Sequence, residues 1–171
     1  FSHPMAEGIT RTGQLAIRWA ERAVNGYMNK ILKTDNVDYV IAIDTDSLYV
    51  NMGELVRRFE PASPIDFLDT ICKEKIEPVI AKAYEKLYND FGCYTNRMEM
   101  SREVIADRGI WTAKKRYILN VFDNEGVRYS EPKLKIMGIE AIKSSTPSVC
   151  RDGLKELFKV IVSGSESKTQ T

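Results

Sequence analysis

Residues 40–50 constrain the fold more than any other segment, and they read Val-Ile-Ala-Ile-Asp-Thr-Asp-Ser-Leu-Tyr-Val. Two apolar stretches rich in β-branched side chains flank a polar centre, which predicts two strands joined by a tight hairpin. Asp44 and Asp46 lie two residues apart, and alternate residues of a strand project to the same side. We therefore expect both carboxylates at the hairpin tip, close enough to bind one ligand.

Two carboxylates held this close repel each other unless a cation lies between them. Oxygen ligands suit Mg²⁺ or Mn²⁺ better than zinc, and these ions serve phosphoryl and nucleotidyl transfer. An alternative is that the aspartates simply close the turn, because their side chains bond the backbone two residues on. The apolar flanks favour the metal hypothesis, since buried strands rarely deliver unpaired charges to one point.

Size and composition narrow the function classes. The 171 residues suit one domain, and a net charge of +1 means that affinity for nucleic acid must come from local basic clusters. No apolar run approaches the roughly 18 residues of a membrane span, and we expect no secretory signal. The cysteines are expected to be reduced thiols; they are Cys72, Cys93 and Cys150. His3 is the only histidine, which argues against a histidine base.

Hydrophobic periodicity predicts long helices. Apolar residues recur at three- and four-residue steps over Met5–Lys33, with polar residues, including Asn25 and Asn29, on the opposite face. A second helix is predicted over residues 65–91, kinked or split at Pro78.

The remaining chain predicts strands and one more helix. Residues 95–105 are expected to be extended, a strand is predicted over 114–123, and a turn at 123–126 leads into a returning strand over 127–136. Thr146-Pro147 predicts a helix from Ser148 to about residue 162. Together these elements indicate an α+β fold, an antiparallel sheet with helices packed on one face.

The densest basic cluster is Lys114-Lys115-Arg116, which Tyr117 follows. In a strand, Lys115 and Tyr117 would share one face and Lys114 and Arg116 the other. Basic side chains in this arrangement can hold nucleic-acid phosphates. The alternative is a sheet edge that lysines protect against aggregation.

Two other side chains have both a functional and a structural interpretation. Glu103 can add a carboxylate to the metal region, or it can be an ordinary surface glutamate. Trp111 can stack on a base, or it can belong to the core.

These segments together resemble the palm domain of family B DNA polymerases, in particular the replicative polymerases of T-even-type tailed phages. The matching segments are Asp44-Thr-Asp-Ser47, Lys114-Lys-Arg-Tyr117, Lys133-Leu-Lys-Ile-Met-Gly-Ile-Glu140, Lys143-Ser-Ser-Thr-Pro147 and Gly8-Ile-Thr-Arg-Thr-Gly-Gln14. The resemblance covers nearly the whole chain in order and spacing. It implies a palm fragment with a ferredoxin-like core over residues 1–146. Residues 147–171 would form the start of a thumb helix and a disordered tail.

The resemblance implies a role for each matching acid. Asp46 would bind the catalytic metals, two Mg²⁺ (or Mn²⁺) ions in the complete enzyme, which join the primer 3′-hydroxyl to the nucleotide α-phosphate. Asp44 would lie at the primer terminus as the second catalytic aspartate and a further candidate metal ligand. Glu103 and Glu125 match acidic positions near the active site and are weaker candidates for metal ligands.

The resemblance also implies partners. Lys114, Lys115, Arg116 and Tyr117 would hold primer–template DNA, with Lys115 at the terminal phosphates of the primer. A deoxynucleoside triphosphate would be the second substrate. A further metal-binding strand and a nucleotide-binding helix would have to be supplied by polymerase segments before Phe1. A sliding clamp is a candidate partner of the parent enzyme, in the cytoplasm of an infected bacterium.

The sequence therefore predicts a fragment of a DNA-directed DNA polymerase palm, with a two-metal mechanism in the parent and no activity alone. One alternative is a subunit of a split polymerase that needs a partner chain. Another is a non-catalytic, ferredoxin-like module that binds nucleic acid. A reverse transcriptase is disfavoured, because that family places two adjacent aspartates where this chain has Asp44-Thr45-Asp46.

Overall fold

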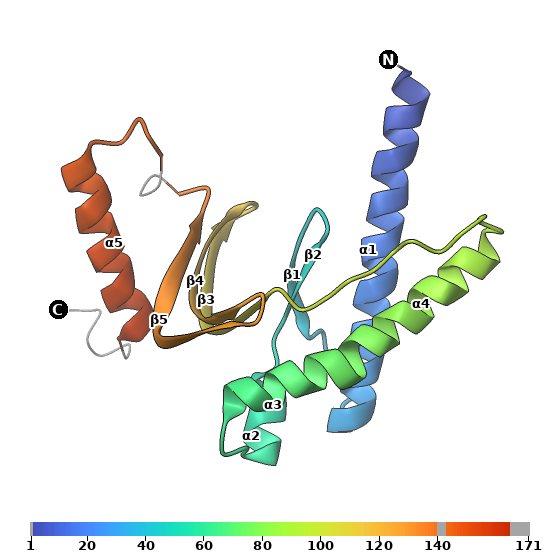
Figure 1. Cartoon of the computed structure of the whole chain (residues 1–171), viewed down its shortest axis with the longest axis horizontal. Coiled ribbons are helices and arrows are strands. Elements are labelled where there is room, and N and C mark those ends of the chain that lie inside the picture. Colours follow the sequence, from blue (N-terminus) through green and yellow to red (C-terminus); the bar gives the residue numbers. More distant parts are fainter. Residues whose placement is uncertain (1, 140–142, 165–171) are drawn as a thin grey trace. The chain divides into compact units, whose positions relative to one another are not determined.

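The computed structural model describes residues 2–139 and 143–164 and divides into two compact units, Phe1–Arg102 and Glu103–Thr171 (Figure 1). Each unit contains helices and antiparallel strands, so the predicted α+β class is confirmed. One refinement is that the strands are divided between a two-stranded sheet and a three-stranded sheet. The palm and thumb limits, 1–146 and 147–171, stay a prediction. From residue 165 on, the predicted tail lies outside the described residues.

The first unit begins with α1, which spans His3–Leu32 as its periodicity predicted. The hairpin β1 (Val40–Asp44) and β2 (Ser47–Val50) follows. The remaining elements are α2 (Gly53–Phe59), α3 (Pro64–Ile71), the π-helical turn η1 (Cys72–Ile76) and α4 (Glu77–Asp90). The short helix α2 was not predicted, because seven residues are too few for a periodic pattern.

The predicted helix over residues 65–91 is interrupted for a local reason. Pro78 has no N–H to donate to the carbonyl of Glu74, and its ring crowds that carbonyl. The backbone widens just before it, where the N–H of Glu77 donates to the carbonyl of Cys72, five residues back. Proline thus predicted the break, and the π-helical turn is how the chain accommodates it without ending the helix.

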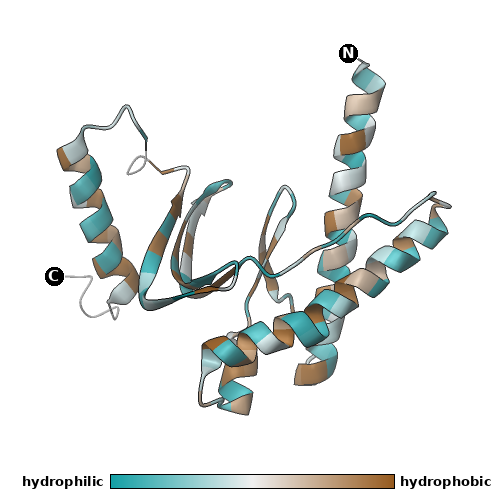
Figure 2. Ribbon diagram, viewed as in Figure 1, coloured by the Kyte–Doolittle hydropathy of each residue, from teal (hydrophilic) through white to brown (hydrophobic). Residues whose placement is uncertain are grey.

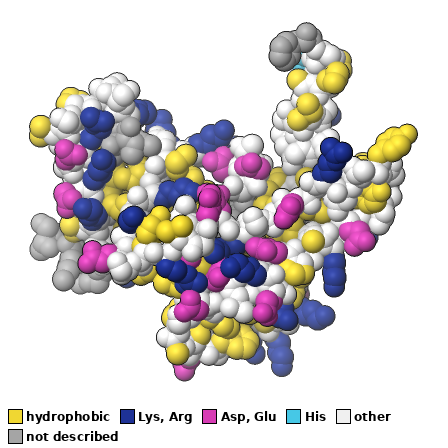
Figure 3. Space-filling model, viewed as in Figure 1, with side chains coloured by type: hydrophobic (Ala, Val, Ile, Leu, Met, Phe, Trp, Pro, Cys, Tyr) yellow, Lys and Arg dark blue, Asp and Glu magenta, His cyan; other side chains and the backbone are white. Residues whose placement is uncertain are grey.

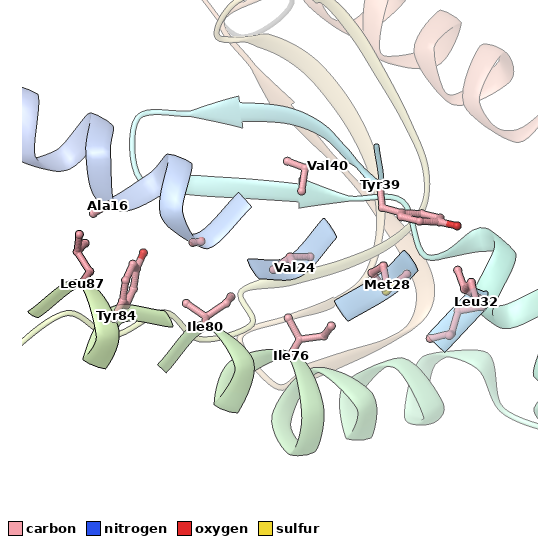
Figure 4. Packing of buried hydrophobic residues seen from close by; sticks show 12 residues of the cluster. Ala16, Val24, Met28, Leu32, Tyr39, Val40, Ile76, Ile80, Tyr84 and Leu87 are labelled. Carbon is pink, nitrogen blue, oxygen red and sulfur yellow. The ribbon is translucent and has the colours of Figure 1, made fainter. Parts of the chain in front are cut away.

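The core of the first unit lies between α1 and α4, and the start of the hairpin packs on it (Figure 4). Along the ribbons of both helices, hydrophobic residues alternate with hydrophilic ones (Figure 2). The buried cluster contains Ala16, Ala20, Val24, Met28, Leu32, Tyr39, Val40, Leu55, Ile76, Ile80, Tyr84 and Leu87. Helix α1 extends beyond this core, since residues 2–15 are all exposed.

Met28→Ala is expected to lower the free energy of unfolding by about 3 kcal/mol, because truncation of a buried Met side chain leaves a cavity. Met28 is 0% exposed, whereas Met5 on the same helix is 70% exposed. Met5→Ala is therefore the matched control, with an expected change within about 0.5 kcal/mol. Urea unfolding followed by circular dichroism measures both, and equal effects would contradict the packing of α1 on α4.

The second unit is a three-stranded antiparallel sheet in the order β3-β4-β5, with one helix on it. Its elements are β3 (Val104–Ala113), β4 (Arg116–Asn124), β5 (Val127–Met137) and α5 (Ser148–Ser163). The predicted returning strand and last helix are confirmed. Of the segment predicted to be extended, only Val104 and Ile105 lie in a strand. Charged side chains of both signs are interspersed over the visible surface (Figure 3).

Trp111 belongs to the packed part of the second unit. A Cβ atom at Gly109 would lie only 2.6 Å from the Trp111 ring, so the ring occupies the space that the glycine leaves. The Trp111 and Tyr117 ring centroids are 6.3 Å apart. This packing favours the core interpretation of Trp111. In the part of the chain that the structure describes, no helix is long and apolar enough to cross a membrane.

Candidate metal and nucleic-acid site

The hairpin predicted at residues 40–50 is confirmed. Strands β1 and β2 pair antiparallel with Asp44 opposite Ser47, so Thr45 and Asp46 form a two-residue loop. Thr45 has a φ of 53°, which β-branched residues rarely adopt. Asp44 is half-buried at the end of β1, and its Oδ1 accepts a hydrogen bond from Thr45 Oγ1 at 3.3 Å. Asp46 is exposed.

Strand alternation does not position the two aspartates, and that part of the prediction is wrong. Alternation applies only within a strand, and Asp46 lies in the loop, beyond the end of β1. The tight turn therefore determines where its carboxylate lies. Ile43 and Leu48 pack against the core cluster, so apolar contacts hold the hairpin while its tip stays accessible.

The hairpin tip offers carboxylate oxygens, a donor type that fits Mg²⁺ or Mn²⁺ rather than zinc. Among the described residues, no group of three or more His, Cys, Asp or Glu side chains could hold a metal ion. An ion at Asp44 and Asp46 would therefore need further oxygen ligands. Phosphate oxygens of a nucleotide and water are the usual source for Mg²⁺.

The basic cluster forms a turn, and its predicted strand arrangement is wrong. Strand β3 ends at Ala113 and β4 begins at Arg116, so Lys114 and Lys115 form the loop between them. Lys115 has a φ of 61°, and a residue in this left-handed region lies outside a strand. The two lysines therefore do not follow the alternation of the strand. The consequence is a single exposed basic segment, called the basic loop below, in which Arg116 at the start of β4 follows Lys114 and Lys115.

Tyr117 differs from the three basic residues because it is only 5% exposed. Its ring lies against that of Trp111, directly after the exposed loop. The structure therefore places Tyr117 where it supports the loop from within the sheet.

Gly138, which follows β5, lies against the basic loop. It has a φ of 66°, and a Cβ atom there would overlap the carbonyl oxygen of Lys115 and lie 3.2 Å from Cγ of Arg116. Only glycine fits this close approach of two backbones. Two of the segments that carry the resemblance, 114–117 and 133–140, thus meet at one place. Residue 140 itself lies outside the described residues.

Glu103 and Glu125 lie close together in the second unit. The N–H of Glu125 donates to the carbonyl of Glu103 at 2.6 Å. The Glu103 carboxylate is 51% exposed and lies 2.6 Å from Nζ of Lys135. Glu125 is exposed in the turn between β4 and β5, with a φ of 51°. The structure therefore brings the backbones of these two weaker candidates for metal ligands together. Lys135 partly neutralises the carboxylate of Glu103.

Asp123 is a structural residue whose importance the sequence did not reveal. It is fully buried, and its Oδ2 lies 2.7 Å from Nε of Arg128. Its Oδ1 accepts the N–H of Gly126 at 3.0 Å, so it stabilises the turn that carries Glu125. An aspartate at the first position of a turn, with glycine three residues on, is the sequence signal that could have indicated this.

Arg102 is a second residue that sequence reasoning missed. Its side chain is 6% exposed, and its Nη2 lies 2.5 Å from Oδ1 of Asp69. Its backbone N–H donates to Oε1 of Glu77 at 2.8 Å. Hydrogen bonds from Lys73 and from Arg102 hold the pKa of Asp69 below its ordinary value, against the effect of desolvation. Arg102 therefore attaches the chain, one residue before Glu103, to α3 and α4 of the first unit.

The candidate residues therefore fall into two groups. The first unit carries Asp44 and Asp46 on one hairpin, and the second carries the basic loop and the two glutamates. The first group can bind a divalent cation, and the second can bind phosphates through exposed lysine and arginine side chains.

No protein-family profile matches the chain. The DNA-directed DNA polymerase of Escherichia phage RB69 is 40% identical over an alignment of 168 positions that covers 90% of this chain and 19% of the relative. The DNA-directed DNA polymerase of Enterobacteria phage T4 is 37% identical over an alignment of 179 positions that covers 96% of this chain and 20% of the relative. The chain thus spans about a fifth of the length of the curated relatives that it matches. The predicted resemblance is confirmed, and the chain matches a fragment of a DNA polymerase of the T-even phage type.

Proposed function

We propose that this chain is part of the palm of a phage DNA-directed DNA polymerase and takes part in template-directed deoxynucleotidyl transfer. Homology to two phage polymerases over 90% or more of the chain is the observation that carries this proposal. The hairpin with Asp44 and Asp46 supports it, because the exposed carboxylate of Asp46 on a tight turn, beside the half-buried Asp44, can reach a nucleotide-bound cation. We place residues 1–146 in the palm and 147–171 at the start of the thumb.

In this proposal Asp46 binds the catalytic Mg²⁺ or Mn²⁺ ions, and Asp44 lies beside the primer terminus. Divalent ions held there would neutralise charge on phosphate oxygens and favour ionisation of the attacking hydroxyl. The chain's own contribution is to present Asp46 from a loop whose position the hairpin determines. Half-burial of Asp44 suits a residue that supports this geometry. On the resemblance alone, Glu103 and Glu125 are assigned as weaker candidates for metal ligands of the parent enzyme.

The basic loop is assigned to the backbone of primer–template DNA. Lys114, Lys115 and Arg116 are all exposed there, and basic side chains fix the register of DNA through its phosphates. Tyr117 would act by holding the loop in place through its packing on Trp111.

The proposed substrates are primer–template DNA and a deoxynucleoside triphosphate. Other segments of the parent polymerase would supply the second metal-binding strand and the nucleotide-binding helix, and a sliding clamp is a candidate partner. The reaction would take place in the infected bacterial cell. We expect the purified chain alone to extend no primer in the presence of Mg²⁺. Extension that Asp46→Ala abolishes would contradict this part of the proposal.

The triple replacement of Lys114, Lys115 and Arg116 by alanine is expected to weaken binding of the chain to primer–template DNA. Each phosphate that the protein no longer neutralises should reduce the slope of log K against log salt by about 0.9. The slope should therefore become shallower by two to three units, roughly, in fluorescence anisotropy titrations at several salt concentrations.

A matched control removes the same charge elsewhere. It replaces three exposed helical lysines of the first unit by alanine, namely Lys30, Lys75 and Lys82. We expect little change in its salt slope. An equal loss in both triple variants would show that the affinity reflects total charge and not the basic loop. An affinity for DNA that depends neither on Mg²⁺ nor on Asp46 would favour a non-catalytic nucleic-acid-binding module.

A further inference from the structure

Two asparagines of α1 bind the segment that leads into β1. Asn29 pairs with both polar groups of Val37, whose N–H donates to Oδ1 at 3.0 Å and whose carbonyl accepts from Nδ2 at 2.7 Å. Asn25, one helical turn earlier, accepts the N–H of Tyr39 at 2.8 Å and donates to Oδ1 of Asp38 at 2.8 Å. These residues were expected on the solvent face of the helix, and they are half-buried instead.

The contacts form a continuous network at the start of β1. Thr34 Oγ1 donates to Oδ1 of Asn29 at 2.8 Å and lies 2.9 Å from the hydroxyl of Tyr39. Asp38 Oδ1 also accepts the N–H of Val40 at 3.0 Å. On the other side, the carbonyl of Tyr39 accepts the N–H of Asn51 at 2.7 Å. The strand is therefore held from both sides where it begins.

The asparagine amide is well suited to hold the backbone of an extended segment. It carries a donor and an acceptor in a fixed plane, as a peptide group does, so Asn29 replaces a neighbouring strand for Val37. The donor and acceptor of Val37 also fix which end of the Asn29 amide faces each group. Apolar contacts of Ile43 and Leu48 hold the hairpin against the core, but such contacts are non-directional and do not set a register.

The hairpin needs this directional restraint because its own pairing is short and irregular. Strands β1 and β2 have five and four residues, and the register shifts between Val40 and Ala42. A two-stranded hairpin alone is marginally stable, and a slip of one residue would turn every side chain to the other face. Val40 and Asp44 are the first and last residues of β1. A shift of the strand at Val40 would therefore also move Asp44 and the loop that follows it.

We propose that Asn25 and Asn29 are positioning residues that set the register of β1 and thereby the place of the Asp44–Asp46 loop. They hold residues 37–39 at the start of β1, so their proposed effect on the loop is indirect. The consequence for catalysis rests on the proposed function, whereas the restraint on β1 does not.

Removal of the asparagine amide tests the restraint directly. Asn25→Leu keeps a side chain of similar size and removes both the acceptor of the Tyr39 N–H and the donor to Asp38. Amide hydrogen exchange of Tyr39 in the full chain is expected to become about tenfold faster in Asn25→Leu, the cost of one lost hydrogen bond.

Asn29→Leu is a second variant, expected to speed exchange at Val37 by a similar factor. Asn89→Leu is its matched control, because Asn89 is an exposed asparagine of α4. Unchanged exchange in both Asn25→Leu and Asn29→Leu would overturn the proposal. An equal acceleration at Tyr39 and Val37 in Asn89→Leu would also overturn it.

The same variants in an intact polymerase that carries this segment test the catalytic consequence. Displacement of a reacting group by about 1 Å costs on the order of 100-fold in rate. Asn25→Leu should therefore lower kcat by about tenfold or more without a change in KM for the nucleotide, whereas Asn89→Leu should change neither. An unchanged kcat for Asn25→Leu, beside a large loss for Asp46→Asn, would refute the positioning role alone. Full extension by Asp46→Asn would refute the proposed function and leave the hydrogen-exchange result standing.

Discussion

Asp46→Asn in an intact polymerase that carries this segment should slow nucleotide incorporation by about 10³-fold or more. The substitution keeps the size of the side chain and removes the negative charge. A bound catalytic metal contributes several kcal/mol of transition-state stabilisation, and each 1.4 kcal/mol, roughly, is a factor of ten in rate. Asp46 is exposed at the hairpin tip, so the substitution would remove the proposed metal ligand without disturbing the core. Single-turnover primer extension measures the rate.

The matched control is Asp35→Asn, an exposed aspartate in the segment before β1. It should leave the rate within about twofold of the original, since an exposed side chain away from the site contributes little. Binding of primer–template DNA should stay unchanged in both variants, because the basic loop is intact. Incorporation by Asp46→Asn at more than a tenth of the original rate, roughly, would contradict the assignment of Asp46 as a metal ligand.

Gly138→Ala should destabilise the second unit by about 4 kcal/mol, the sum of two costs. The φ of 66° strains a residue with a Cβ atom. The added Cβ would also overlap the carbonyl oxygen of Lys115, a backbone group that cannot move unless the basic loop moves. Urea unfolding measures the loss, and DNA affinity should fall with it, because Arg116 is also displaced.

Gly153→Ala is the control for this substitution. Gly153 lies in α5, and a Cβ atom added to it would meet no other atom within 4 Å. Alanine also favours a helix over glycine by about 1 kcal/mol. The control should therefore be neutral or slightly stabilising. Equal stability of the two variants would contradict the close approach of Gly138 to the loop between β3 and β4.

Sequence patterns correctly predicted the structural elements that are determined by residues close together in the chain. The apolar flanks of Asp44-Thr45-Asp46 predicted the hairpin, and Pro78 predicted a broken helix. The basic cluster was identified but misplaced, because nothing in its composition indicates that Lys115 takes a left-handed φ. The turn at Lys115 packs against Gly138, which follows β5. Because Gly138 is distant in the sequence, the pattern of residues around Lys115 did not indicate this contact.

Long-range polar contacts were the least predictable part. Asn25 and Asn29 lie on the polar side of an amphipathic helix, and periodicity alone treats that side as solvent-exposed. Their actual partners are backbone groups of residues 37–39. Arg102 is similar, because only the folded chain brings it to Asp69. Such residues were missed because hydrogen bonding to a distant segment leaves no periodic signal in the sequence.

The central claim is that the Asp44–Asp46 loop lies at the catalytic metal of a polymerase. Iron-directed cleavage tests this most directly, because Fe²⁺ can take the place of Mg²⁺ and, with ascorbate and peroxide, cuts the backbone beside its site. In an intact polymerase with primer–template DNA and nucleotide, we expect cleavage at residues 44–46 that excess Mg²⁺ suppresses and Asp46→Asn abolishes. Cleavage confined to other segments, or cleavage at 44–46 that neither Mg²⁺ nor Asp46→Asn affects, would contradict the claim.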